Sequence, residues 1–277
     1  MKKYVIDFFA GVILLIIVIL IMKFITLDLR VITLIAAIFL CFYSYLTTPK
    51  RNVSLLSIFL VTLPISIGFV LGILPELPSM WISILIFFYA TLLGNWIHSK
   101  KIAILGVLPF FFFSYLIVPK LVTNNLFQLV NEIAPSVSME SISTQEKINL
   151  DDFKGKIVVI DFFGTWCAPC IKEMEELKEL KKKYKNRTDI EFLLVCTEFA
   201  KDNPEKAKRF IEKRDLNFKA YFDFKNEAHK LFGFTGVPAL VILDKENNIR
   251  LKHEGYNESE DLKGNLIKLI ELLSNSQ

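Results

Sequence analysis

The sequence contains little cysteine and histidine, and its first half contains little charge. Four cysteines in 277 residues, Cys41, Cys167, Cys170 and Cys196, are too few and too scattered for a domain built on a disulfide scaffold. The three histidines are far apart in the sequence, which argues against a histidine-based metal site. Neither half is poor in apolar residues, so the composition excludes an intrinsically disordered chain.

Charge is divided unevenly along the chain. Of the 33 Lys and Arg and the 29 Asp and Glu, residues 1–134 hold nine and four, which leaves 24 and 25 for residues 135–277. The mean hydropathy of +0.43 is high for a soluble protein. The excess positive charge lies at the ends of apolar runs and forms no basic stripe, so nucleic-acid binding is not predicted. The pattern predicts a membrane-embedded first half and a soluble second half of about 140 residues, enough for one domain core.

Five apolar runs are long enough to span a bilayer, which takes roughly 20 mostly apolar residues. They lie at about 5–26, 29–47, 53–74, 80–98 and 101–119. The first run differs from a secretory signal because its apolar core is longer than usual and no small-x-small cleavage pattern follows it. The sequence therefore predicts an all-α, multi-span domain in membrane lipid over residues 1–119, followed by a polar linker over 120–134.

The loops between these runs predict the orientation of the chain. Three basic pairs fall on one side of the predicted topology: Lys2-Lys3, Lys50-Arg51 and Lys100-Lys101. Because Lys and Arg near helix ends stay on the cytoplasmic side, the N-terminus is expected inside and residues 135–277 outside the cytoplasmic membrane. Cys41 is the lone thiol of the membrane half and is expected to be a small buried residue.

Residues 135–277 alternate strand-like and helix-like segments. Buried strands are predicted at 157–163 and 190–196, helices at 171–185, 204–214, 226–232 and 259–273, and a hairpin from 239–243 and 249–254. This alternation, which ends in a hairpin, indicates an α/β domain with a mixed central sheet.

Cys167 and Cys170 follow the first of these strands and begin the helix after it. A structural zinc site would need a second Cys or His pair, and an inert pair is the other alternative. A redox dithiol needs only two cysteines in this strand-to-helix context. Cys167, just ahead of the helix dipole, is the predicted exposed nucleophile, and Cys170, one turn deeper, is the predicted resolving thiol. This chemistry requires no metal and no cofactor. Trp166 is predicted to pack beside the pair and to shape the approach of the substrate.

The motif Asp161-Phe-Phe-Gly-Thr-Trp-Cys-Ala-Pro-Cys170, with Thr235-Gly-Val-Pro-Ala-Leu-Val-Ile242 downstream, resembles the thioredoxin superfamily. Phe153-Lys-Gly-Lys-Ile-Val-Val-Ile160 narrows the resemblance to the TlpA/ResA-like, membrane-tethered thiol-disulfide oxidoreductases. The likeness covers about residues 135–277 and implies a thioredoxin-like fold there. We assign no family to the five-span half, which is a departure from the single anchor or signal of many members.

The resemblance also implies roles for four further residues. Pro238 matches the family's cis-proline, which faces the dithiol, so the backbone at Val237 would pair with an extended substrate segment. Asp161 lies where thioredoxins have a buried acid that helps to deprotonate the resolving cysteine, and an acid inside an apolar strand is otherwise costly. Glu173 lies where some ResA-like members have an acid near the dithiol. A solvated helix carboxylate is the alternative for Glu173.

These observations and the resemblance predict a membrane-anchored protein-disulfide reductase that acts on disulfide-containing proteins outside the cytoplasmic membrane. Clients in the family include apocytochrome c. Because the membrane half has one thiol, a separate membrane dithiol is the expected electron donor. Two alternatives stay open: a disulfide-forming oxidant or isomerase, and a membrane assembly module with a redox-sensing domain.

Overall fold

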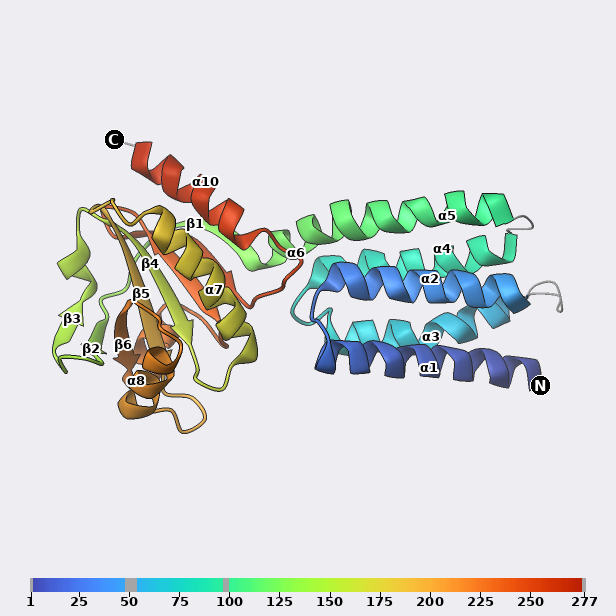
Figure 1. The fold of residues 1–277 in the computed structure, drawn as a ribbon, viewed down its shortest axis with the longest axis horizontal. Helices are drawn as coiled ribbons and strands as arrows, with labels where there is room; N and C mark the ends of the chain where they lie inside the picture. The colour runs from blue at the N-terminus through green and yellow to red at the C-terminus, as the bar shows by residue number, and fades with distance from the viewer. Residues whose placement is uncertain (1, 48–53, 97–99, 276–277) are drawn as a thin grey trace. The chain divides into compact units, whose positions relative to one another are not determined.

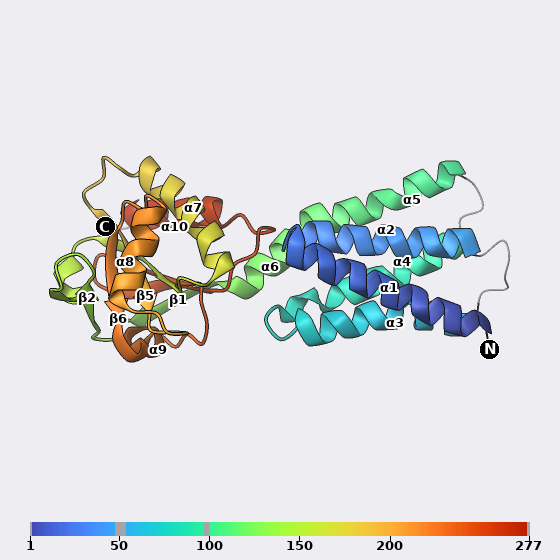
Figure 2. The same cartoon turned by 60° about the horizontal axis from the view of Figure 1, so that its bottom comes forward.

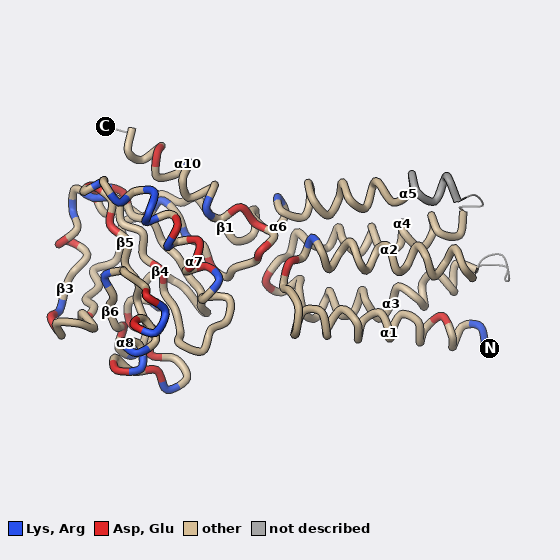
Figure 3. The backbone as a smooth tube through the Cα atoms, in the orientation of Figure 1, with Lys and Arg blue, Asp and Glu red and all other residues tan. Residues whose placement is uncertain are grey.

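The computed structural model describes residues 2–47, 54–96 and 100–275, with residues 100–105 as backbone only. It divides into two compact units (Figure 1). One comprises Met1–Asn125 and Asn257–Glu260, and the other comprises Leu126–Tyr256 and Asp261–Gln277. Charged residues are concentrated in the second unit and are rare along the helices of the first (Figure 3). The division predicted from charge and hydropathy is therefore present in the structure.

The first unit is helical. Its elements are α1 (Lys2–Phe24), α2 (Leu29–Thr47), α3 (Leu55–Gly72), η2 (Pro78–Trp81), α4 (Ile82–Trp96), α5 (Lys100–Phe112), the π-helix η3 (Phe113–Ile117) and α6 (Val118–Leu126). Five helices in the described part of the chain are long and apolar enough to cross a membrane: Lys2–Phe24, Leu29–Thr47, Leu55–Gly72, Pro78–Trp96 and Gly106–Leu126. The predicted all-α region with five apolar spans is confirmed, with the last span longer at its C-terminal end.

Close approach of the helices explains two glycines in the spans. A Cβ atom on Gly94 of α4 would lie 2.1 Å from the carbonyl oxygen of Cys41 in α2. A Cβ atom on Gly11 of α1 would lie 2.3 Å from the carbonyl oxygen of Val61 in α3. Lipid tails provide no hydrophobic drive between helices, so small residues that allow backbone contact stabilise such pairs.

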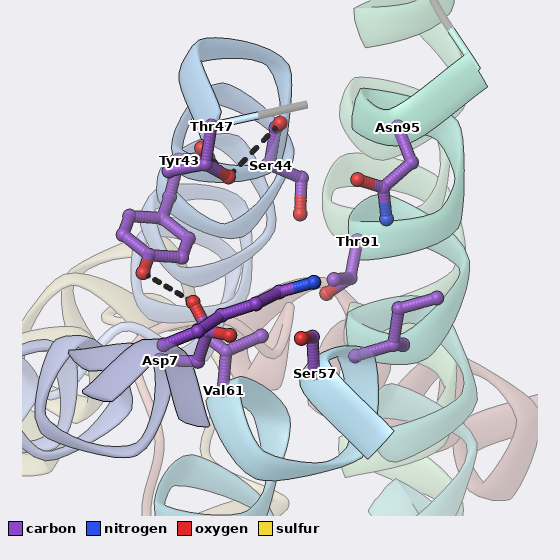
Figure 4. A pocket seen from close by; sticks show the side chains of 10 residues that line it. Asp7, Tyr43, Ser44, Thr47, Ser57, Val61, Thr91 and Asn95 are labelled. Carbon is purple, nitrogen blue, oxygen red and sulfur yellow. Dashed lines mark hydrogen bonds between the residues drawn. The ribbon is translucent and has the colours of Figure 1, made fainter. Parts of the chain in front are cut away.

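A small polar cluster lies inside this unit (Figure 4). Asp7 of α1 is buried, and one of its carboxylate oxygens accepts a hydrogen bond of 2.7 Å from the hydroxyl of Tyr43 in α2. Ser57 of α3 and Asn95 of α4 line the same cavity of about 20 Å³, room for about one water molecule. The acid in the first predicted span is thus a buried, hydrogen-bonded side chain.

The second unit is built on an eight-stranded mixed sheet (Figures 1 and 2). The strands are β1 (Phe127–Ile133), β2 (Ser138–Ser141), β3 (Lys147–Asn149), β4 (Ile157–Phe163), β5 (Ile190–Thr197), β6 (Lys219–Asp223), β7 (Ala239–Leu243) and β8 (Asn248–Glu254), in the order β1-β8-β7-β4-β5-β6-β2-β3. The β4–β5 and β5–β6 pairs are parallel, whereas the other pairs are antiparallel. The predicted mixed central sheet is confirmed.

Helices cover the sheet and complete the core. They are η4 (Leu150–Phe153), α7 (Ala168–Lys183), α8 (Pro204–Lys213), η5 (Phe224–Asn226), α9 (Glu227–Leu231) and α10 (Leu262–Asn275). One face of β4 packs against α7 and α10, which lie side by side, through Val159, Leu177 and Leu266. The other face packs around Phe162 and Phe232. All seven residues of β4 are buried because this strand lies in the centre of the sheet.

The structure differs from the expected linker over residues 120–134. These residues are helical as far as Leu126 and then form β1, which pairs with β8 from Phe127↔His253 onward. As an edge strand, β1 exposes Gln128 and Glu132, which give the segment its polar composition. The short strands β2, β3 and β6 were also not predicted.

We expect the substitution Gly94→Ala to destabilise the membrane unit, because the added methyl group would collide with the α2 backbone. Gly72→Ala is the matched control, since no atom lies within 4 Å of its added methyl group. Alanine favours a helix over glycine by about 1 kcal/mol, so the control variant should unfold at the wild-type temperature or above it. Thermal unfolding of the detergent-solubilised chain, followed by circular dichroism, gives the unfolding temperatures of the two variants. Equal changes in unfolding temperature for the two variants would contradict the close contact between Gly94 and the α2 backbone.

Candidate functional site

The site forms where β4 ends and α7 begins. Cys167 is the N-cap residue of α7, and its Sγ accepts a hydrogen bond of 3.1 Å from the backbone N–H of Cys170. The two cysteines form a disulfide with a Cα–Cα distance of 5.3 Å. Pro169 occupies the first helical turn, where its missing N–H leaves no hydrogen bond unmade. The helix N-terminus therefore directs unpaired N–H groups and its dipole toward the sulfur of Cys167.

The prediction that Cys167 is exposed was wrong for this oxidised state. Its exposed fraction is 3%, against 0% for Cys170. The order is as predicted, with Cys167 nearer the surface, but the disulfide itself is almost covered.

The loop before β7 covers one side of the disulfide. The Val237–Pro238 peptide bond is cis, and the carbonyl oxygen of Val237 lies 3.7 Å from Sγ of Cys167. The structure thus brings together the two motifs that are about 70 residues apart in the sequence. The backbone of Val237 is in position to contact whatever approaches Cys167.

Two side chains that the sequence analysis did not select fix this loop. One carboxylate oxygen of Glu254 in β8 accepts three hydrogen bonds, from the backbone N–H groups of Thr235 and Gly236 and from the Thr235 hydroxyl, at 2.7–2.8 Å. Nε2 of the buried His229 lies 2.8 Å from the carbonyl oxygen of Gly236. Their local sequence gave no signal because Glu254 acts across a strand pairing and His229 acts on a loop beyond the end of α9.

The loop that carries the motif is also anchored. Asp202 is buried and accepts hydrogen bonds from the backbone N–H of Thr165 at 2.9 Å and from its hydroxyl at 2.6 Å. Lys206 pairs with the same carboxylate at 2.7 Å. Between this anchor and the disulfide, Trp166 leaves 53% of its surface exposed. An exposed indole on a loop that Asp202 anchors provides an apolar contact surface for a partner.

Asp161 of β4 and Glu173 of α7 both lie away from solvent. Both are 0% exposed, which excludes the alternative of a solvated helix carboxylate for Glu173. Within the described residues, neither carboxyl oxygen of Asp161 has a hydrogen-bond partner. Burial raises the pKa of Asp161 to about 8. Asp161 is therefore a protonated acid near neutral pH.

Sequence reasoning did not select His253, which has no motif around it. It is 0% exposed, and its Nδ1 lies 3.8 Å from Oε1 of Glu173. Cys196 is fully buried, and burial raises the pKa of its thiol. No group of three or more His, Cys, Asp or Glu side chains suited to a metal ion occurs in the described ranges.

The fold and this site define the second unit as a thioredoxin-like domain with a redox cysteine pair. Residues 130–252 match the AhpC/TSA family. Over 124 residues the chain is 35% identical to the thiol-disulfide oxidoreductase ResA of Bacillus thuringiensis subsp. konkukian, which covers 45% of this chain and 69% of that protein. It is 30% identical over 152 residues to ResA of Geobacillus thermodenitrificans, covering 55% and 84% of the two chains.

A third relative is the thioredoxin-like protein YneN of Bacillus subtilis, 29% identical over 133 residues, or 48% of this chain and 76% of that protein. The chain belongs to the ResA-like thiol-disulfide oxidoreductases, and the similarity lies in its C-terminal half. The resemblance inferred from the cysteine and proline motifs is confirmed.

We expect Asp161→Asn to stabilise the oxidised protein by an amount that grows with pH. The ordinary pKa of Asp is about 4, so between about pH 4 and pH 8 the folded state binds a proton that the unfolded state has released. The wild-type acid therefore costs increasing stability as pH rises through this window, whereas Asn does not titrate. Thermal unfolding at several pH values across this window gives the difference in unfolding temperature between Asp161→Asn and the wild type.

Asp189→Asn provides the matched control for this series. The Arg187 guanidinium beside Asp189 lowers the pKa of that carboxyl to about 2, below the window. Its effect on the unfolding temperature should be constant from about pH 5 to pH 8. A difference for Asp161→Asn that stayed flat over the same range would contradict a raised pKa at Asp161.

Proposed function

We propose that the chain is a membrane-anchored reductase of disulfides in proteins outside the cytoplasmic membrane. The observation that carries this proposal is the Cys167–Cys170 disulfide at the start of α7, with Val237 and Trp166 beside it. Membership of the ResA-like thiol-disulfide oxidoreductases supports the chemistry. The five apolar helices support the anchoring.

Burial of the cysteine pair favours the reductive direction. Oxidants of this type are strong because their reduced form, with its thiolate, is stabilised. Here Cys167 is 3% and Cys170 0% exposed, and burial disfavours a charged thiolate. A destabilised reduced form passes its electrons on readily, which makes the dithiol a better reductant.

The reaction proceeds by two exchanges of thiolate for disulfide. The Cys167 thiolate attacks one sulfur of the substrate disulfide, so that a mixed disulfide forms and the other substrate sulfur leaves as a thiolate. The Cys170 thiol then loses its proton, and its sulfur attacks Sγ of Cys167. The Cys167–Cys170 bond forms, the mixed disulfide breaks, and two electrons have passed from the enzyme to the substrate.

Contacts around Cys167 suggest how a substrate segment is held. The backbone of Val237 would pair with an extended chain, as in strand addition to a sheet edge. The exposed ring of Trp166 would cover an apolar side chain of the same segment. The backbone contact is independent of substrate sequence, and the ring contact requires only an apolar side chain. Such loose requirements suit an enzyme that acts on several disulfide-containing proteins.

Return of the enzyme to its reduced form requires a donor. The chain has two other cysteines, Cys41 and Cys196, and both are buried and unpaired with sulfur. Neither can form a second dithiol, so a separate membrane dithiol is the electron donor in this proposal. The basic pairs at Lys2-Lys3, Lys50-Arg51 and Lys100-Lys101 support an N-terminus inside and a redox domain outside. Residues 50–51 lie outside the described residues.

We expect Cys170→Ser to trap substrates as mixed disulfides with Cys167, because the thiol that releases them is gone. Cys167→Ser should trap no substrate, since the thiol that attacks the substrate disulfide is gone. Cells that express each variant are quenched with acid, alkylated and compared on non-reducing gels. Cys41→Ala, which alters a buried thiol of α2, should behave like the wild type.

The identity of the trapped proteins tests the orientation as well. Exported proteins with cysteine pairs are the expected partners. Trapping of cytoplasmic proteins would contradict the proposed side of the membrane, and equal trapping by both cysteine variants would contradict the assigned roles of Cys167 and Cys170.

A further inference from the structure

The loop before β7, residues 235–238, is held from two sides at Gly236. The backbone N–H of Gly236 donates a hydrogen bond of 2.8 Å to Oε1 of Glu254. Its carbonyl oxygen lies 2.8 Å from Nε2 of the buried His229. Because a carbonyl oxygen can only accept a hydrogen bond, Nε2 of His229 carries a proton and donates this bond. Both backbone groups of Gly236 are therefore bonded to side chains that lie outside the loop.

Three further hydrogen bonds extend this hold along the loop. The backbone N–H and the hydroxyl of Thr235 both donate to the same Oε1 of Glu254, at 2.7 Å. On the other side of Val237, the N–H of Gly255 donates to the carbonyl oxygen of Pro238 at 2.8 Å. The φ of Gly255 is +90°, a conformation that favours glycine at this turn. The loop is thus bonded to the end of β8 both before and after Val237.

His229 is itself held in place. Its backbone N–H and that of Ala228 donate hydrogen bonds of 2.9 Å to the two carboxyl oxygens of Asp223, the last residue of β6. Three phenylalanine rings pack around its imidazole at centroid distances of 5.3–5.7 Å: Phe162, Phe199 and Phe234. A side chain that is already fixed in this way loses little conformational entropy when it donates to Gly236.

Val237 lies between the held residues and directs its backbone toward the disulfide. Its carbonyl oxygen lies 3.7 Å from Sγ of Cys167. In the part of the chain that the structure describes, the backbone N–H of Val237 donates no hydrogen bond. Main-chain hydrogen bonds provide the affinity when an extended segment adds to a strand edge. The direction in which Val237 offers these two groups depends on the peptide units that Glu254 and His229 hold.

We propose that Glu254 and His229 are positioning residues for disulfide exchange: they hold the loop so that the backbone of Val237 pairs with the substrate segment that carries the disulfide. The proposal rests on the proposed function and deepens it, because it assigns the binding of the substrate backbone to residues outside both sequence motifs. A disulfide without a peptide backbone gains nothing from this arrangement. The two side chains therefore act on the binding of protein substrates and not on the sulfur chemistry of Cys167.

Two disulfide substrates separate these effects. In both reactions the reduced pair of Cys167 and Cys170 gives two electrons and two protons to the substrate, the Cys167–Cys170 bond forms, and the substrate becomes two thiols. A peptide with one disulfide offers a backbone to Val237. Hydroxyethyl disulfide offers an S–S bond without a backbone.

The test uses the full chain in detergent micelles, reduced with dithiothreitol and freed of it before mixing. We expect Glu254→Ala to lower the rate constant with the peptide about tenfold or more, because three hydrogen bonds of the loop are lost. The rate constant with hydroxyethyl disulfide should stay within about twofold of the wild type. His229→Phe, which keeps a ring but loses the donor, should act in the same direction.

Glu254→Gln tests the role of the accepting oxygen. Its amide oxygen can accept the same hydrogen bonds, so this variant should keep most of the rate with the peptide. A loss as large as that of Glu254→Ala would contradict the proposal. Thr235→Val removes one of the three bonds to Glu254 and should show a smaller loss, confined to the peptide. It keeps the test decisive if Glu254→Ala does not fold.

Glu132→Ala is the matched control, because it also removes a glutamate that contacts β8, at Lys252. Both of its rate constants should equal those of the wild type. A wild-type chain that reduces neither substrate would overturn the proposed function itself. A wild-type chain that reduces both, with Glu254→Ala slowing both equally or neither, would overturn only the role of Glu254 and His229.

Discussion

The redox site depends on one constraint, the placement of two cysteines where a fully buried strand ends and a helix begins. The central strand β4 fixes the position of the turn because all of its residues are packed from both sides. The first turn of α7 then sets the Cys167–Cys170 distance at which a disulfide closes. The remaining parts of the site are arranged around this point. Asp202 holds the turn through Thr165, and Glu254 holds the loop before Pro238. Asp161 and Glu173 are buried in the strand before the turn and the helix after it.

Local features of the sequence were enough to predict the centre of this arrangement. The apolar run at 157–163 predicted a buried strand, and the cysteine spacing after it predicted the pair at the helix start. The hairpin from residues 239–254 was also visible as two apolar runs with a turn. Each of these signals comes from residues that are neighbours in the chain, and packing in the folded unit does not override them.

What the sequence did not predict arises from contacts between distant segments. β1 has the polar composition of a linker because it lies at an edge of the sheet, and its strand character follows from pairing with β8, about 120 residues later. His253 carries no local motif. Its contact with Glu173 depends on the β7–β8 register and on which face of α7 is turned toward the sheet. The prediction that Cys167 is exposed failed for the same reason, since the loop that contacts it through Val237 is 70 residues away in the sequence.

The central claim is that the dithiol donates electrons to its substrates, and the reduction potential of the Cys167–Cys170 pair tests it most directly. The full chain in detergent micelles would be equilibrated with dithiothreitol or glutathione redox buffers, and the oxidised fraction would be measured by alkylation. The account predicts a potential near or below about −250 mV, in the range of thioredoxin. A potential of about −120 to −180 mV, as in disulfide-forming enzymes, would contradict it.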